Sequence, residues 1–96
     1  MYVHLILFNL GPGMQDKAEK MASEASKGYP LLKGFKSVTF FGDPTVGEYG
    51  NMSLWESLED LENARKITKS RFDQDLSGLE KAPRQVHISE VYQPRE

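Results

Sequence analysis

Four side chains able to bind or stack on a small molecule alternate along one short stretch of the chain. They are Tyr49, Asn51, Ser53 and Trp55. A spacing of two residues places side chains on one face of a β-strand. Buried amides and hydroxyls need partners, and apolar walls with a few aimed polar groups are typical of small-molecule pockets. The spacing therefore indicates a ligand site, while a partly wet face with Trp55 filling the core stays open as the alternative.

Asn9 is a second candidate, because it interrupts an apolar run at the end of the first predicted strand. An amide there would face a ligand if the sheet opens into a cleft at that point. Asparagine is also a frequent turn residue at strand ends, and that alternative stays open.

The two histidines, His4 and His87, lie in the first and last predicted strands. The odd spacing of His87 and Glu90 points them to opposite faces of a strand, so they cannot share a metal ion. A metal site needs at least three ligands, and the sequence does not assemble them. We therefore predict no metal site and expect hydrogen-bonded histidines on a sheet.

Composition excludes several classes of function. There are no cysteines, which excludes disulfides and thiolate catalysis. The net charge is −2 and the basic residues are scattered, so no nucleic-acid partner is expected. The longest apolar stretch, Leu5 to Phe8, is far too short to span a bilayer, and no signal-peptide pattern precedes it. We expect a cytoplasmic protein with no membrane partner.

Hydrophobic periodicity and turn residues predict six elements. In chain order they are a strand over Tyr2–Leu10, a helix over Met14–Lys27, strands over Phe35–Gly42 and Glu48–Glu56, a helix over Leu58–Leu76 and a strand over Gln85–Tyr92, with a linker over Gly78–Pro83. The second helix is expected to bury a stripe made of Leu58, Leu61, Ala64, Ile67, Phe72, Leu76 and Leu79. The order β-α-β-β-α-β predicts an α+β, ferredoxin-like fold, with one antiparallel four-stranded sheet and both helices on one face.

The first predicted strand is apolar on both faces, and this bears on the oligomeric state. Val3, Leu5 and Leu7 point one way, whereas Ile6 and Phe8 point the other. Two helices with apolar stripes can cover only one side of the sheet. A second copy of the same sheet is the economical cover for the other side, so we expect a homodimer. The alternative is a monomer with that face covered by loops, but the loops are short.

Two segments resemble the antibiotic biosynthesis monooxygenase (ABM) family. Pro30-Leu31-Leu32-Lys33-Gly34-Phe35 looks like the passage that leads into the second strand of that family, and Leu54-Trp55-Glu56-Ser57-Leu58-Glu59 looks like its strand-to-helix signature. The resemblance covers nearly the whole chain. It implies one ABM-like domain over residues 1–96 and a dimeric α/β barrel.

The resemblance also implies an activity, because the family includes cofactor-free oxygenases that convert phenolic polyketides to quinones. Those enzymes carry an asparagine four residues before a strand tryptophan, which Asn51 and Trp55 match. An aromatic residue that follows in them falls on Leu61 here, so the chain departs from the pattern of those enzymes at this position. The implied reaction needs no metal or flavin: the substrate's own phenolate reacts with O2, while the protein orients the ring and excludes water.

The chain also resembles the haem-degrading monooxygenases in one position, Asn9. Their helical tryptophan falls on Ala64 and their haem-ligating histidine falls on Gln74, and neither residue can replace them. Without an axial ligand, no haem is expected.

Three hypotheses follow. The first is a cofactor-independent monooxygenase acting on a small aromatic or quinol, with Asn51 bonding a substrate oxygen, Trp55 walling the pocket, and Asn9, Tyr49 and Ser53 assisting in binding. The second is a non-catalytic dimeric module that binds a small hydrophobic ligand. The third is a purely structural dimer, which predicts no pocket near Asn51.

Overall fold

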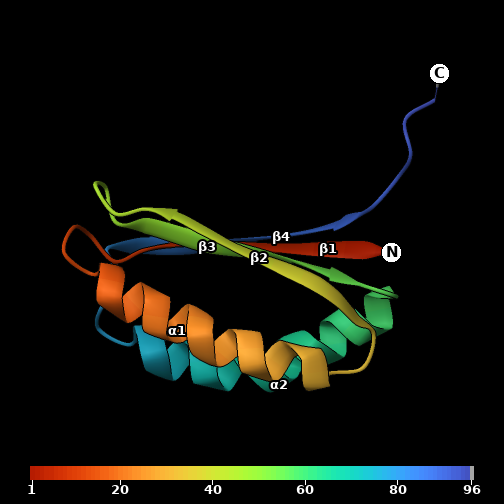
Figure 1. Cartoon of the computed structure of the whole chain (residues 1–96), viewed down its shortest axis with the longest axis horizontal. Helices are drawn as coiled ribbons and strands as arrows, with labels where there is room; N and C mark the ends of the chain where they lie inside the picture. The colour runs from red at the N-terminus through yellow and green to blue at the C-terminus, as the bar shows by residue number, and fades with distance from the viewer. Residues whose placement is uncertain (96) are drawn as a thin grey trace.

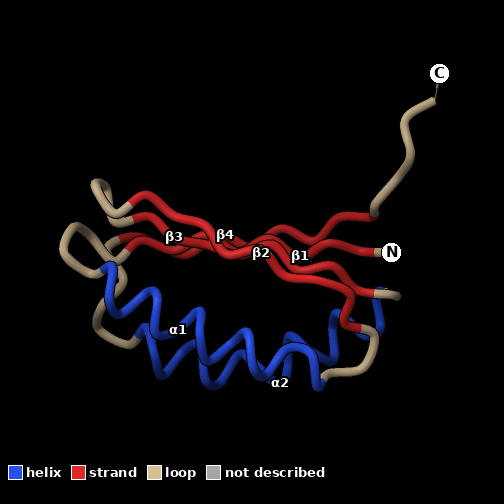
Figure 2. The backbone as a smooth tube through the Cα atoms, in the orientation of Figure 1, coloured by secondary structure: helices blue, strands red, loops and turns tan. Residues whose placement is uncertain are grey.

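The computed structural model describes residues 1–95 and contains the six predicted elements in the predicted order. They are β1 (Tyr2–Asn9), α1 (Gln15–Gly28), β2 (Phe35–Asp43), β3 (Glu48–Trp55), α2 (Leu58–Leu76) and β4 (Ala82–Glu90), with a short 3₁₀ helix, η1 (Tyr29–Leu31), after α1. Figure 1 shows both helices on the same side of the sheet, and Figure 2 shows helices and strands as two separate layers.

The four strands form one antiparallel sheet in the order β2-β3-β1-β4. The central pair is β1 and β3, in which Ile6 lies opposite Asn51 and His4 lies opposite Ser53. With both helices on one face, this arrangement confirms the predicted α+β, ferredoxin-like fold.

Local chemistry explains where α2 begins. Ser57 has an extended backbone, and its hydroxyl oxygen accepts a hydrogen bond from the Asp60 N–H at 3.1 Å. This side-chain cap satisfies one of the N–H groups that a helix start leaves without an intrahelical partner. The predicted bounds of α2, Leu58 to Leu76, are confirmed.

The β2–β3 turn packs against the β1–α1 turn. The Leu10 N–H donates to the Gly47 carbonyl at 2.8 Å. Gly47 has a φ of 76°, and a Cβ there would overlap the Gly11 backbone. Glycine is therefore required at position 47 both by its backbone conformation and by the close approach of the two turns.

Two predicted details are wrong. The last strand begins at Ala82 and ends at Glu90, so part of the expected linker is strand and Tyr92 lies beyond it. Pro83 is tolerated because β4 is an edge strand that pairs only with β1.

The apolar stripe that the sequence predicts for α2 is wrong at two positions. Leu58 and Ile67 are 42% and 64% exposed, so they do not face the sheet.

The face of α2 that meets the sheet is made instead of Leu61, Ala64, Thr68, Phe72 and Leu76, at intervals of three and four residues. Including Thr68 keeps the stripe on one face of a helix of this length, whereas Ile67 lies about 100° away around the axis. Thr68 satisfies its hydroxyl by donating to the Ala64 carbonyl at 3.0 Å.

The core between helices and sheet consists of two apolar clusters. One contains Phe8, Leu10, Ala18, Tyr49 and Leu76, and the other contains Trp55, Leu61 and Ala64. They lie toward opposite ends of the covered face, because Phe8 pairs with Tyr49 at one end of β1 and Tyr2 pairs with Trp55 at the other. The space between them is where the polar residues of β1 and β3 lie.

The opposite face of the sheet, which we call the open face, has no helix over it (Figure 1). Its apolar residues are Val3, Leu5, Leu7, Phe41, Met52 and Leu54. Phe41 and Met52 are 43% and 47% exposed in the single chain. Neither helix in the described part of the chain has the length and hydropathy needed to span a membrane.

Candidate functional site

A cavity of about 260 Å³ lies between the sheet and the two helices. Its apolar walls are Phe8, Met21, Ala22, Ala25, Leu32, Phe40, Ile67 and Phe72. The polar side chains that reach it are Asn51 and Tyr29 inside, Thr68 on α2, and Glu24, Arg71 and Asp75. We call this space the main cavity. Its size suits a small aromatic molecule.

Asn51 is the polar group of β3 that the structure brings to this cavity. It is only 3% exposed and lies opposite Ile6 of β1 and Phe40 of β2. Its Oδ1 atom has no hydrogen-bond partner among the described residues. Most buried side-chain acceptors in folded proteins are partnered, so an unpartnered amide oxygen at a cavity wall is suited to a ligand donor.

Tyr29, in η1, is the second polar residue at the same wall, and sequence reasoning missed it. Burial raises the pKa of its phenol, and the nearby Asn51 side chain offsets part of that rise. The group therefore stays protonated at neutral pH and can donate a hydrogen bond. In the sequence, Tyr29 looks like the last apolar member of the first helix, and only its pairing in space with Asn51 indicates another role.

Trp55 and Ser53 lie behind this wall. The Trp55 indole N–H donates to the Ser53 hydroxyl oxygen at 2.9 Å, and both residues are 2% exposed. The Trp55 ring meets Tyr29 edge-to-face, with centroids 6.2 Å apart and planes at 79°. The structure thus places Trp55 outside the main cavity, where it supports the Tyr29 ring and borders a small void of about 10 Å³.

Tyr49 and Asn9 lie away from the main cavity. Tyr49 is buried in the cluster around Phe8, and its hydroxyl has no partner within residues 1–95. The Asn9 side-chain oxygen accepts from the Gly11 N–H at 2.9 Å, and its carbonyl accepts from the Lys81 N–H at 2.8 Å. These contacts stabilise the turn after β1, which is the role that the sequence left as the alternative to ligand binding for Asn9.

Charged side chains lie at the edge of the main cavity, not inside it. Arg71 of α2 pairs with Glu24 of α1 and, at 3.3 Å, with Asp75 one turn along α2. The Arg71 side chain is 60% exposed, so these pairs contribute at most about 1 kcal/mol to stability. They link the two helices and leave the interior neutral.

The two histidines lie on opposite faces of the sheet. His4 faces the helices and pairs with Ile88 in register, whereas His87 pairs with Leu5 and faces the open side. Within residues 1–95, no three His, Cys, Asp or Glu side chains come together in a way that could hold a metal ion.

The arrangement supports binding and orientation of a planar molecule. A phenol donor and an amide acceptor share one wall, and apolar side chains form the others. Asn51 and Tyr29 are themselves buried, at 3% and 7% exposed, and electrostatic interactions with buried dipoles are stronger than with the same groups in water.

Solved structures share this fold over almost the full chain. A monooxygenase of Streptomyces coelicolor from the gene ActVA-Orf6, in complex with the ligand nanaomycin D, is 19% identical over 99% of this chain and 90% of its own, with a TM-score of 0.77. SnoaB, a cofactor-independent oxygenase of Streptomyces nogalater, is 13% identical over 97% of this chain and 93% of its own, with a TM-score of 0.73. An inferred antibiotic biosynthesis monooxygenase of Nitrosomonas europaea is 10% identical over 97% of this chain and all of its own, with a TM-score of 0.81.

At these identities the likeness establishes the fold, which is the one found in antibiotic biosynthesis monooxygenases. No protein-family model matches the sequence. No curated protein matches it either.

Proposed function

We propose that this chain is an ABM-type monooxygenase that oxidises a small aromatic or quinol with O2 and needs no cofactor. The observation that carries the proposal is the buried, unpartnered Oδ1 of Asn51 at the wall of an apolar cavity. The shared fold with monooxygenases, one of them a cofactor-independent oxygenase, adds support.

The reaction balances without an outside reductant. The methylene of an anthrone loses two hydrogens, whereas a phenol loses one hydrogen from a ring carbon and one from its hydroxyl. In both cases the carbon gains one oxygen atom of O2, and the second oxygen atom leaves with the two hydrogens as water. The substrate supplies the electrons, which flow most readily from its phenolate form. The protein has to orient the ring, stabilise charge on the substrate oxygen and keep water away from the reacting carbon.

Each residue at the wall then has a defined part. Asn51 accepts a hydrogen bond from a substrate hydroxyl through Oδ1, and the Tyr29 phenol donates to a substrate oxygen as negative charge develops there. Trp55 holds the Tyr29 ring by its edge-to-face contact, and Ser53 fixes the indole. Tyr49 and Asn9 act in packing and in the turn.

The working form in this proposal is a homodimer of one-domain chains in the cytoplasm, joined through the open face. The apolar residues of β1, β2 and β3 on that face give a second copy a surface to cover. Burying it removes apolar area from water, which is the main favourable term in association of this kind.

A second candidate, a binding module without catalysis, is favoured by one observation. The carboxylates that reach the main cavity, Glu24 and Asp75, are both paired with Arg71, and the Tyr29 phenol is held protonated. Among the described residues, the lining of the main cavity therefore offers no free base, so turnover would depend on the substrate ionising by its own acidity. A ligand that does not ionise would be bound and released unchanged.

An oxygen electrode separates the two functions. Wild-type protein is mixed with a panel of anthrones and naphthols, and O2 uptake is compared with quinone formation measured by absorbance. We expect uptake and quinone in equal amounts for at least one member, and Asn51→Ala is expected to lower kcat/KM about a hundredfold. Asn63→Ala, the same change on the exposed side of α2, is the matched control and is expected to keep the rate.

Two outcomes would decide against the enzyme. Thermal stabilisation by panel members with no O2 uptake would identify a binding module. Equal rates for Asn51→Ala and Asn63→Ala would show that Asn51 is not at the reacting centre.

A further inference from the structure

A second cavity, also of about 260 Å³, lies on the other side of α2, between that helix and strands β1 and β4. We call it the basic cavity. Its apolar side chains are Ile6, Phe72 and Val86, its uncharged polar ones are His4, Tyr29 and Thr68, and its charged ones are Arg65, Lys69, Asp73 and Arg84. Its lining has three cationic side chains and one carboxylate, whereas the lining of the main cavity has one cationic side chain and two carboxylates.

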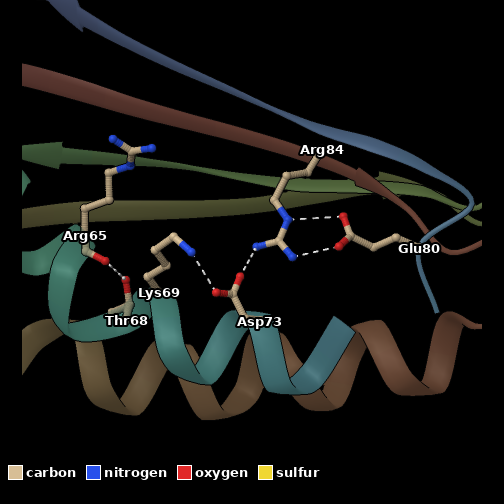
Figure 3. Close-up of polar contacts among 6 residues, drawn as sticks. All are labelled: Arg65, Thr68, Lys69, Asp73, Glu80 and Arg84. Carbon is tan, nitrogen blue, oxygen red and sulfur yellow. Dashed lines mark hydrogen bonds and ion pairs between the residues drawn. The ribbon is translucent and has the colours of Figure 1, made fainter. Parts of the chain in front are cut away.

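Most of these charges already have partners. Lys69 pairs with Asp73 at 2.8 Å, Asp73 with Arg84 at 2.9 Å, and Arg84 with Glu80 at 2.7 Å, as the dashed lines in Figure 3 show. Two cations and two carboxylates form this chain, so its net charge is zero. It fixes one end of the cavity and leaves little capacity there to bind an anion.

Arg65 is the cation left over. No carboxylate in residues 1–95 lies within ion-pair distance of it. In Figure 3 its guanidinium extends from α2 toward the strands and takes no part in the Lys69–Asp73–Arg84–Glu80 chain. A guanidinium can bind both oxygens of a carboxylate at once, which makes it the natural anchor for such a group.

His4 lies near this cation on the floor of the same cavity. Its Nε2 atom is buried and has no hydrogen-bond partner within the described chain. Burial and, next, the charge of Arg65 lower the pKa of its imidazole, while Glu62 acts in the opposite direction. The ring is therefore neutral near pH 7, and a proton on Nε2 would give it one unused hydrogen-bond donor.

We propose that the basic cavity binds a small carboxylic acid, with its carboxylate on Arg65 and His4 and its apolar body against Ile6, Phe72 and Val86. A single unpaired cation balances one negative charge. A dianion such as a phosphate monoester would leave an uncompensated charge next to apolar walls, which is costly. The apolar side chains in turn favour a body such as a ring over a purely polar acid.

The basic cavity and the main cavity are separated by only a few side chains. Tyr29, Thr68 and Phe72 border both. An acid bound at Arg65 would therefore be separated from the wall that carries Asn51 by these shared side chains alone. The proposal does not require oxygenase activity, because binding of an acid can be measured without turnover.

Benzoate is the probe, and the full chain is titrated while its backbone amide and imidazole NMR signals are followed. We expect the largest shifts at His4, at Arg65 and in β4 near Val86, with millimolar affinity that is typical of so small a ligand. Arg65→Gln is expected to weaken benzoate binding about tenfold. Lys66→Gln, which removes a positive charge from the next position of α2 outside this cavity, is expected to leave it unchanged.

Two further arms complete the test. Benzyl alcohol, which keeps the ring and lacks the charge, is expected to bind at least about tenfold more weakly than benzoate. His4→Gln, an uncharged replacement, is expected to weaken benzoate less than Arg65→Gln does. Equal affinity of wild type and Arg65→Gln, tighter binding of phenyl phosphate than of benzoate, or benzoate shifts confined to the residues around Asn51 would each overturn the proposal.

Discussion

The two faces of the sheet reverse the usual arrangement of polar and apolar side chains. The face under the helices carries His4, Asn51 and Ser53 along its two central strands. The open face carries Val3, Leu5, Leu7, Met52 and Leu54 along the same strands. The covered face is thus the more polar one at its centre, and the exposed face is the more apolar one.

Each face then has a feature that the single chain leaves incomplete. Under the helices, buried polar atoms of His4 and Asn51 lack partners within residues 1–95, which is costly unless a ligand or water provides one. On the open face, apolar side chains such as Met52 stay half exposed. The difference is the basis for the two uses of one sheet that we propose: binding a small molecule beneath the helices and binding a second copy on the other side.

The largest expected effect comes from the packed end of the covered face. Trp55→Ala removes a ring that is 2% exposed and contacts Tyr29 and Phe35, so it should lower the free energy of unfolding by about 3–5 kcal/mol. Urea denaturation measures this. A loss below about 1 kcal/mol would mean that the Trp55 cluster is loosely packed and cannot hold Tyr29 in place.

The next effect is expected on the open face. Met52→Lys places a charge at the centre of the proposed dimer contact, and because the copies are identical the change enters the interface twice. The dimer dissociation constant should rise about a hundredfold or more in sedimentation equilibrium. Ser70→Lys, on the exposed side of α2, is the matched control. Unchanged association of Met52→Lys would remove this face from the interface.

A smaller effect is expected at the centre of the covered face, and its sign is informative. Asn51→Leu replaces a buried amide with an apolar side chain of similar size. Because Oδ1 has no partner, the variant should be as stable as the wild type or more stable by about 1 kcal/mol. Thermal and urea unfolding measure this. A loss of more than about 2 kcal/mol would show that Asn51 serves the fold and is not held for a ligand.

The smallest effect is expected from pH. His4 has a pKa below its ordinary value of 6.5 in the folded chain, first because of burial and then because of Arg65, with Glu62 opposing. The unfolded chain therefore takes up a proton at higher pH than the folded chain does. The contribution of His4 is complete above about pH 6.5 and is lost as the pH falls from there through the lowered folded value.

Comparing wild type with His4→Gln at several pH values between 7.5 and 5 isolates this contribution. The stability difference between the two proteins should change over that range in the direction that favours His4→Gln at low pH. A difference that stays constant would show that His4 is well hydrated and lies outside the desolvated floor of the basic cavity.

Much of the fold could be predicted because it depends on local signals. Hydrophobic periodicity and turn residues located the strands and the helices, including the start of α2 at Leu58. The start of β4 was missed because Pro83 normally interrupts strands, and its tolerance at the sheet edge depends on strand order. Ile67 was predicted in the core because it is the more hydrophobic of two neighbouring residues. The spacing of the other buried residues of α2 places Thr68, and not Ile67, toward the sheet.

The candidate site was less predictable for a physical reason. The period of a strand shows that Asn51 and Trp55 share a face, but it does not show which of them lies at a cavity and which lies behind it. Tyr29 reaches Asn51 because η1 follows α1 and brings the Tyr29 ring against Trp55 of β3, which is a tertiary feature. The Arg65–His4 pair likewise joins residues 61 positions apart, from α2 and β1.

Sedimentation velocity of the wild-type chain at micromolar concentration tests most directly whether the open face binds a second copy. We predict a single species of twice the chain mass of 10.9 kDa. A stable species of 10.9 kDa would show that the apolar side chains of the open face tolerate water, and would contradict the account of one sheet with two uses.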